Sequence, residues 1–363
     1  MVLYLFILFV ISIFYLFFRN KNKIMVAFFI SFFSSILPTI RSIEVGTDTN
    51  AYINMFSNRQ SLGDWLSQGT ELGFALSVKI LQTININDYW VYFFFYSMIF
   101  NFLVINFILK QSNYRYLALI SFFTFSTIYL IQFNILRQAL ALAFFCHAIP
   151  YLFSEKYIKY YLTVVLASLF HNSAIILFIF PFLYKLSNKK IRHLLIFLPF
   201  FVFLFSFFYK KIVSHYALIS GFSRYEYYLD KVEEKGVGST LMFFEYVFIF
   251  LILSIFFKRI NLKYDEVHFK FWYLMFYISL LFNFSILFMG LPYEGPGRIL
   301  IYFMVSYLFV LGYIVKIFNY SHRLYVQMIM VMIMVLQFIL VFSFATYHGV
   351  FPYKINSQFN IFG

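Results

Sequence analysis

Long apolar runs constrain the fold of this chain more than any other feature of its sequence. Twelve runs of 13 to 21 residues are separated by more polar segments, most of them short. A helix needs about 20 mostly apolar residues to cross a bilayer. The pattern therefore predicts an all-α polytopic membrane protein with about twelve transmembrane helices, at 3–18, 24–40, 89–109, 115–132, 136–153, 157–170, 172–184, 193–209, 241–257, 270–289, 298–316 and 324–344.

The small number of charges excludes a soluble protein. Charged residues make up 12% of the chain, whereas soluble domains contain about 25%. The single cysteine, Cys146, excludes an intrachain disulfide and a cysteine-based metal cluster. A net charge of +14 would suggest a nucleic-acid partner in a soluble protein. In a membrane protein the charge instead reports orientation, so no nucleic acid is expected.

The distribution of charge predicts which loops face the cytoplasm. With twelve crossings, one set of alternate loops holds 17 Lys and Arg and three acidic residues, and the other side holds 11 of each sign. The positive-inside rule places the first set in the cytoplasm and both termini outside. This separation requires 157–184 to form a short hairpin with His171 at its outer tip.

The chain is predicted to be one multi-pass domain over residues 1–363. Its two large outer loops, 41–88 and 210–240, are each too short for a folded soluble enzyme domain. Any active site must therefore be built from these loops and the outer helix ends. Within the first loop, 70–81 is predicted to be a short helix in the membrane interface.

Ionisable and aromatic residues gather on the predicted outer side. Charged groups near spans are costly and are functional candidates by default. Arg137 and Arg298 open the fifth and eleventh spans, and His171 is the hairpin tip. The full candidate set is Arg41, Asp48, Tyr52, Glu71, Arg137, His171, Arg224, Tyr225 and Arg298.

These residue types suit transfer of a group from a diphosphate. Arginine offers paired donors that match phosphate oxygens, and helix N-termini add positive charge at Arg137 and Arg298. A carboxylate can accept the proton of an attacking hydroxyl, with Asp48 the first choice and Glu71 the second. Arg137 and His171 join these carboxylates in the predicted catalytic set. The other candidates would bind diphosphate or sugar, namely Arg41, Tyr52, Arg224, Tyr225 and Arg298. No metal-ligand spacing or nucleotide fingerprint is present, so neither a metal nor a cofactor is expected.

Structural interpretations of the same residues stay open. The two arginines can simply extend toward the interface, and His171 can be a satisfied residue of a turn. Asp48 is also a suitable cap for a helix that contains Tyr52. Glu71 can be a surface carboxylate.

An ordered set of motifs resembles a known family. The motifs are Arg41…Gly46-Thr47-Asp48…Tyr52…Phe56, Glu71-Leu-Gly-Phe74, Leu136-Arg137-Gln138…Ala141 and Phe170-His171-Asn172-Ser173-Ala174. They resemble the EpsG-type branch of the Wzy-like bacterial polysaccharide polymerases. The resemblance implies a GT-C-like glycosyltransferase of the bacterial cytoplasmic membrane that polymerises O-antigen, capsule or exopolysaccharide. Its substrates would be undecaprenyl-diphosphate-linked oligosaccharides at the outer face, and a chain-length regulator is a further partner to consider.

Three other functions compete with this interpretation. A lipid-linked oligosaccharide flippase or other transporter usually shows repeats and charge at mid-membrane, and this chain shows neither pattern. An O-antigen ligase would share the donor, so the sequence separates it poorly from a polymerase. An acyltransferase would need a histidine close to a carboxylate, and none is near His171 in the sequence.

Overall fold

The computed structural model describes residues 1–86, 88–124, 128–220, 237–263, 266–291, 296–344 and 349–359. These residues are almost entirely helical, and their one strand-like pairing is an isolated bridge between Arg41 and Ile355. The elements are α1 (Val2–Phe18), α2 (Lys23–Ile40), α3 (Thr49–Ser57), α4 (Leu62–Ser67), α5 (Leu72–Thr83), α6 (Tyr89–Gln111), α7 (Arg115–Phe123), η1 (Ile128–Phe133), α8 (Leu136–Phe153), α9 (Tyr157–Phe170), η2 (Asn172–Ile179), α10 (Phe180–Ser220), α12 (Val237–Ile255), α13 (Phe257–Lys263), α14 (Glu266–Phe288), η3 (Pro296–Ile299), α15 (Leu300–Met304), α16 (Tyr307–Ile317), η4 (Tyr320–His322), α17 (Arg323–Phe344) and η5 (Ser357–Phe359).

The helices confirm the prediction of a polytopic membrane protein. Within the described residues, six helices are long and apolar enough to span a bilayer, or seven if a pair bent by 44° within 297–317 counts as one span. Four shorter apolar helices accompany them. Each predicted apolar run falls on helical segments, but the count of twelve crossings and the GT-C-like fold stay predictions.

Two predicted turns lie at real breaks in the helices. His171 follows α9 in an extended conformation, with φ −157° and ψ 125°, before η2 begins. The predicted cytoplasmic loop 185–192 lies at a kink at Lys190, where φ is −136° and ψ is 32°, so α10 is two helices joined there.

The chain divides into two compact units, residues 1–178 with 330–363 and residues 179–329. In the first unit, α2 packs on α6, α6 on α8, and α8 on α9. The hydroxyl groups of α2 are satisfied inside the helix; Ser31 Oγ, for example, donates to the Ala27 carbonyl at 2.6 Å. Asn101 on α6 donates to Ser35 Oγ at 3.0 Å, which links the two helices by a polar contact of the kind that joins membrane helices.

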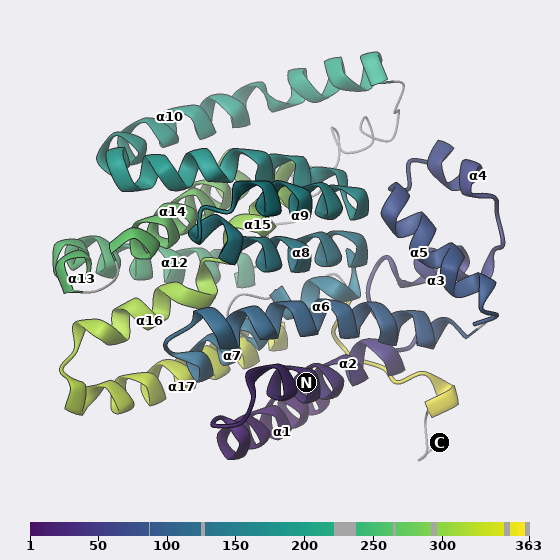
Figure 1. Ribbon diagram of the computed structural model, residues 1–363, viewed down its shortest axis with the longest axis horizontal. Helices are drawn as coiled ribbons and strands as arrows, with labels where there is room; N and C mark the ends of the chain where they lie inside the picture. The colour runs from purple at the N-terminus through teal and green to yellow at the C-terminus, as the bar shows by residue number, and fades with distance from the viewer. Residues whose placement is uncertain are drawn as a thin grey trace. The chain divides into compact units, whose positions relative to one another are not determined.

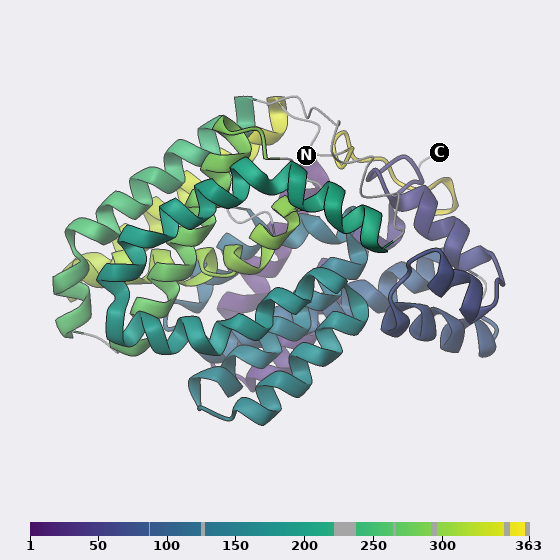
Figure 2. The same cartoon turned by 90° about the horizontal axis from the view of Figure 1, so that it is seen from above.

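Three helices of the predicted outer loop lie at one end of the first unit (Figures 1 and 2). They are α3, α4 and α5, and α5 covers most of the predicted helix 70–81. A capping box starts α4, because Ser61 accepts from the Asp64 N–H while Asp64 accepts from the Ser61 N–H. The first outer loop is therefore a folded segment attached to the ends of the long helices.

The second unit is organised around α14, which contacts α10, α12, α13, α15 and α16. Its polar side chains pair with one another. Ser279 Oγ lies 2.6 Å from the Tyr307 hydroxyl, and Asn283 donates to the same hydroxyl at 3.2 Å. The expectation of a single domain over residues 1–363 stays a prediction.

Candidate functional site

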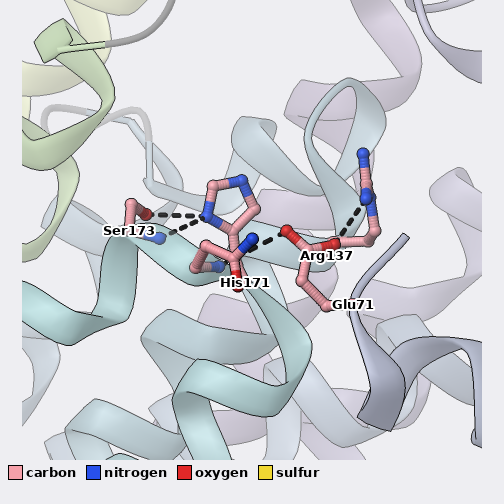
Figure 3. Close-up of polar contacts among 5 residues, drawn as sticks. Glu71, Arg137, His171 and Ser173 are labelled. Carbon is pink, nitrogen blue, oxygen red and sulfur yellow. Dashed lines mark hydrogen bonds and ion pairs between the residues drawn. The ribbon is translucent and has the colours of Figure 1, made fainter. Parts of the chain in front are cut away.

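The carboxylate of Glu71 is the centre of the polar contacts at the end of the first unit. Glu71 occupies the N-cap position of α5, and its side chain is only 7% exposed. One oxygen accepts from Arg137 Nη1 at 2.5 Å, and the other accepts from the Asn172 backbone N–H at 3.3 Å. Figure 3 shows this carboxylate between α8 and the start of η2. Glu71 thus joins three segments that are far apart in the sequence.

Arg137 lies in the first turn of α8. Its side chain is 27% exposed, so the guanidinium is held by the protein and still reaches the surface. Tyr52 of α3 is a second neighbour. Burial raises the pKa of the Tyr52 phenol above its usual value, and the positive charge of the nearby Arg137, together with hydrogen bonding to it, opposes that shift. A guanidinium has five N–H groups, so contacts to Glu71 and Tyr52 leave donors for an anionic ligand.

The ring of His171 is fixed in one tautomer by its neighbours. Its Nδ1 accepts from the Ser173 backbone N–H at 3.2 Å and lies 2.7 Å from Ser173 Oγ. Gln138, the residue after Arg137, donates to the same hydroxyl at 3.3 Å. Because Nδ1 is an acceptor, the neutral ring carries its proton on Nε2. These contacts therefore favour the tautomer of His171 that carries its proton on Nε2.

The loop that carries Asp48 is attached to the turn before α8. The Thr47 N–H donates to Asn134 Oδ1 at 2.7 Å. Gly46 has φ +89°, and a Cβ atom there would lie 2.5 Å from the Phe133 carbonyl oxygen, so only glycine fits. Asp48 occupies the N-cap position of α3 without making a cap hydrogen bond, and it forms no ion pair with any residue that the structure describes.

Arg41 is a buried cation next to this loop. Its side chain is 0% exposed, and its guanidinium carbon lies 4.0 Å from the Phe93 ring centroid and 5.3 Å from that of Phe133. Nη1 donates to the Gln132 carbonyl at 3.5 Å, while Nε and Nη2 have no hydrogen-bond partner among the described residues. Burial lowers the pKa of Arg41 to about 10. Stacking on aromatic rings takes the place of a carboxylate partner.

A segment that sequence reasoning missed covers Arg41. Residues 349–359, which we call the strap, run toward α3–α5 (Figure 1). Three backbone hydrogen bonds join the strap to the Arg41–Asp48 loop and the end of α2: Ser42 N to Lys354 O at 2.9 Å, Gly46 N to Gly349 O at 2.9 Å, and Asn356 N to Ile40 O at 2.8 Å. Lys354 also pairs with Glu44. A turn-forming Gly349 and Pro352 after the last span were the only signals in the sequence.

The structure brings together some of the predicted residues. Asp48, Tyr52, Glu71, Arg137 and His171 lie at one end of the first unit, with Arg41 buried beside them. Arg298 is partly exposed in η3 of the second unit. Two further candidates, Arg224 and Tyr225, lie outside the described residues. Among the described residues, no group of three or more His, Cys, Asp or Glu could hold a metal ion.

The fold and the site define a helical membrane protein with an arginine–carboxylate cluster at the ends of its helices. The model of the EpsG family matches residues 25–355, and the chain belongs to that family. Membership indicates a role in polysaccharide biosynthesis, as a polymerase of the glycosyltransferase type. No curated protein and no solved structure gives a significant match.

Proposed function

We propose that this protein is a polysaccharide repeat-unit polymerase of the bacterial cytoplasmic membrane. It transfers the growing glycan from undecaprenyl diphosphate to a new lipid-linked repeat unit at the outer face, without a metal ion. The observation that carries the proposal is the Arg137–Glu71 pair at the start of α8. It presents a partly exposed guanidinium, the group best suited to a diphosphate, in a chain whose family belongs to polysaccharide biosynthesis.

In this reaction, an acceptor hydroxyl oxygen forms a bond to the anomeric carbon of the donor sugar. The bond from that carbon to the diphosphate oxygen breaks, and its electron pair leaves with undecaprenyl diphosphate. The hydroxyl proton passes to a carboxylate. Because diphosphate is a good leaving group, the main task of the protein is to stabilise the charge that develops on it. Arg137 provides this stabilisation, and His171 donates from Nε2.

The contacts favour Asp48 over Glu71 as the base. Glu71 accepts hydrogen bonds from Arg137 and Asn172, and these two contacts hold its carboxylate in place. It acts as a positioning residue for the guanidinium. Asp48 is half-buried and makes no ion pair with a described residue. Its carboxylate is the better acceptor for the hydroxyl proton.

Deletion of the gene tests the proposal against its rivals. Loss of a polymerase leaves surface lipid capped with a single repeat unit. Uncapped lipid with accumulated lipid-linked chains would instead identify a ligase, and precursor held at the cytoplasmic face would identify a flippase.

Purified protein in vesicles should lengthen lipid-linked repeat units in the presence of EDTA. A requirement for an added divalent ion would contradict the metal-free reaction.

A further inference from the structure

Helix α5 has two apolar faces, and its own unit covers only one of them. Phe74, Ala75 and Val78 are fully buried. On the opposite side, Leu72, Leu76 and Ile80 are 40%, 41% and 63% exposed. Residues four apart lie above one another on a helix, so these three side chains form one continuous stripe. We call it the α5 stripe.

The α5 stripe begins where another exposed apolar surface ends. On α9, Ile158, Leu162 and Leu166 are 79%, 66% and 40% exposed. Because α9 packs along α8, which is long and apolar enough to span a bilayer, we expect this outward face of α9 to contact lipid. The last turn of α9 then meets α5 at Gly73, where a Cβ atom would lie 2.8 Å from the Leu169 carbonyl oxygen. The two helices thus form one apolar surface.

The polar groups beside α5 suit the boundary between lipid and water. Lys79 is partly exposed at the edge of the stripe, and its Nζ lies 5.0 Å from the Trp65 ring centroid. Just beyond the end of α9 come His171 and the Asn172 N–H that bonds Glu71. Helices that lie in a membrane interface combine an apolar face with lysine and aromatic neighbours in this way.

We propose that α5 lies in the membrane interface with the α5 stripe inserted into the lipid. Glu71 immediately precedes this stripe, so the lipid contact fixes the depth of the carboxylate and of the Arg137 that it holds. The pair then lies at the level of the headgroups. The membrane contact itself is independent of the reaction. That this depth matches the phosphates of a lipid-linked substrate rests on the proposed function.

Spin labelling in bilayers tests the contact directly. Leu76→Cys and Ile80→Cys each receive a nitroxide, with Leu162→Cys on α9 as the lipid control and Ser67→Cys on α4 as the water control. The native Cys146 is fully buried and does not compete for the label. All four sites are exposed, so the label disturbs little packing. Collisions with oxygen report lipid, and collisions with a nickel chelate report water.

We expect the ratio of oxygen to nickel collisions at residues 76 and 80 to match that at residue 162. It should be at least threefold higher than the ratio at residue 67. A ratio equal to that at residue 67 would place the stripe in water and overturn the proposal. Exclusion of both reagents would also overturn it, because the stripe would then be covered by protein. The collision rates with oxygen and with the nickel chelate are both measured without glycan synthesis, so they do not depend on the proposed function.

Discussion

At the scale of single residues, Arg137 is held so that its charge and its planar shape both matter. Glu71 bonds Nη1 at 2.5 Å while 27% of the arginine side chain stays exposed. A residue that only extends toward the membrane interface needs no such partner, since its stem rests on apolar surface and its head reaches water. The ion pair therefore favours a role in binding an anion over the structural interpretation.

Replacing Arg137 by lysine separates these two roles. Lysine keeps the positive charge but has no planar pair of donors. If Arg137 binds the diphosphate through paired donors, Arg137→Lys should lower the polymerisation rate at least tenfold. A tenfold loss corresponds to about 1.4 kcal/mol of transition-state stabilisation. Arg137→Ala should be nearly inactive while inserting at the normal level. Arg59→Lys, at an exposed position outside the cluster, is the matched control and should be neutral. Polymerisation by Arg137→Lys at the wild-type rate would contradict the assignment of Arg137 to diphosphate binding.

The two carboxylates should respond differently to amide substitution. Asp48→Asn should bind lipid-linked donor normally but lose about 10²- to 10⁴-fold in turnover, because an amide cannot accept the hydroxyl proton. Glu71→Gln should chiefly weaken donor binding, since an amide keeps the Asn172 contact but loses the charge that orients Arg137. Separate measurement of kcat and KM distinguishes the two. If Glu71→Gln lost turnover and Asp48→Asn chiefly weakened donor binding, Glu71 would be the base.

Sequence reasoning found the members of the cluster but not their pairing. Glu71 and Arg137 were identified because ionisable groups near spans are costly. Their contact depends on how α3, α4 and α5 fold back onto the long helices, and no local pattern records that path. The tautomer of His171 was likewise invisible, because it depends on the backbone N–H of Ser173. Asn134, whose side chain accepts a hydrogen bond from the Thr47 N–H, was not among the candidate residues.

At the scale of elements, the position of α5 against α9 determines where Glu71 lies. The contact needs a glycine, because a Cβ atom at residue 73 would be 2.8 Å from the Leu169 carbonyl and 2.9 Å from its Cβ. Backbone cannot move aside as a flexible side chain can. The same helix carries Glu71 at its N-cap position. Displacing α5 therefore displaces the carboxylate that holds Arg137.

A pair of alanine substitutions tests this contact. Gly73→Ala should push α5 away from α9 and lower polymerisation at least tenfold, about 1.4 kcal/mol in the activation free energy. Gly63→Ala is the control, because its Cβ would meet only Ser61 Oγ at 3.8 Å. Both changes raise helix propensity equally, so propensity cannot explain a difference. Equal activity of the two variants in a quantitative assay of glycan length would show that the α5–α9 contact is dispensable.

The strap is the second element on which the site depends, and it contacts the loop mainly through its backbone. A stop codon after residue 348 removes the acceptors of the Ser42 and Gly46 amides. Hydrogen exchange of 41–48 should then accelerate, exchange within α8 should stay unchanged, and polymerisation should be lost. Lys354→Ala removes only an exposed ion pair, which contributes about 0–1 kcal/mol, so it should polymerise within about fivefold of wild type. Unchanged exchange in the truncated protein would refute the role of the strap.

At the scale of the whole molecule, hydropathy predicted the helices well. In the part of the chain that the structure describes, each apolar run coincides with helical segments, because lipid requires backbone groups to bond within their own segment. The break at His171 and the kink at Lys190 also lie where charge and polarity suggested. The strap escaped prediction because its partners are more than 300 residues away in the sequence.

The orientation can be tested with single cysteines at exposed positions of the first unit. Charge asymmetry predicts that Asn20 and Asn113 face the cytoplasm and that Asn58 and Ser67 face outward, and all four are exposed. In intact cells, an impermeant thiol reagent should label cysteines at positions 58 and 67 but reach 20 and 113 only after lysis. The buried Cys146 supplies the unlabelled background. Labelling at 20 and 113 with protection at 58 and 67 would show that the orientation is the reverse of the predicted one. The Arg137–Glu71 pair would then lie on the cytoplasmic side, away from the proposed outer-face substrate.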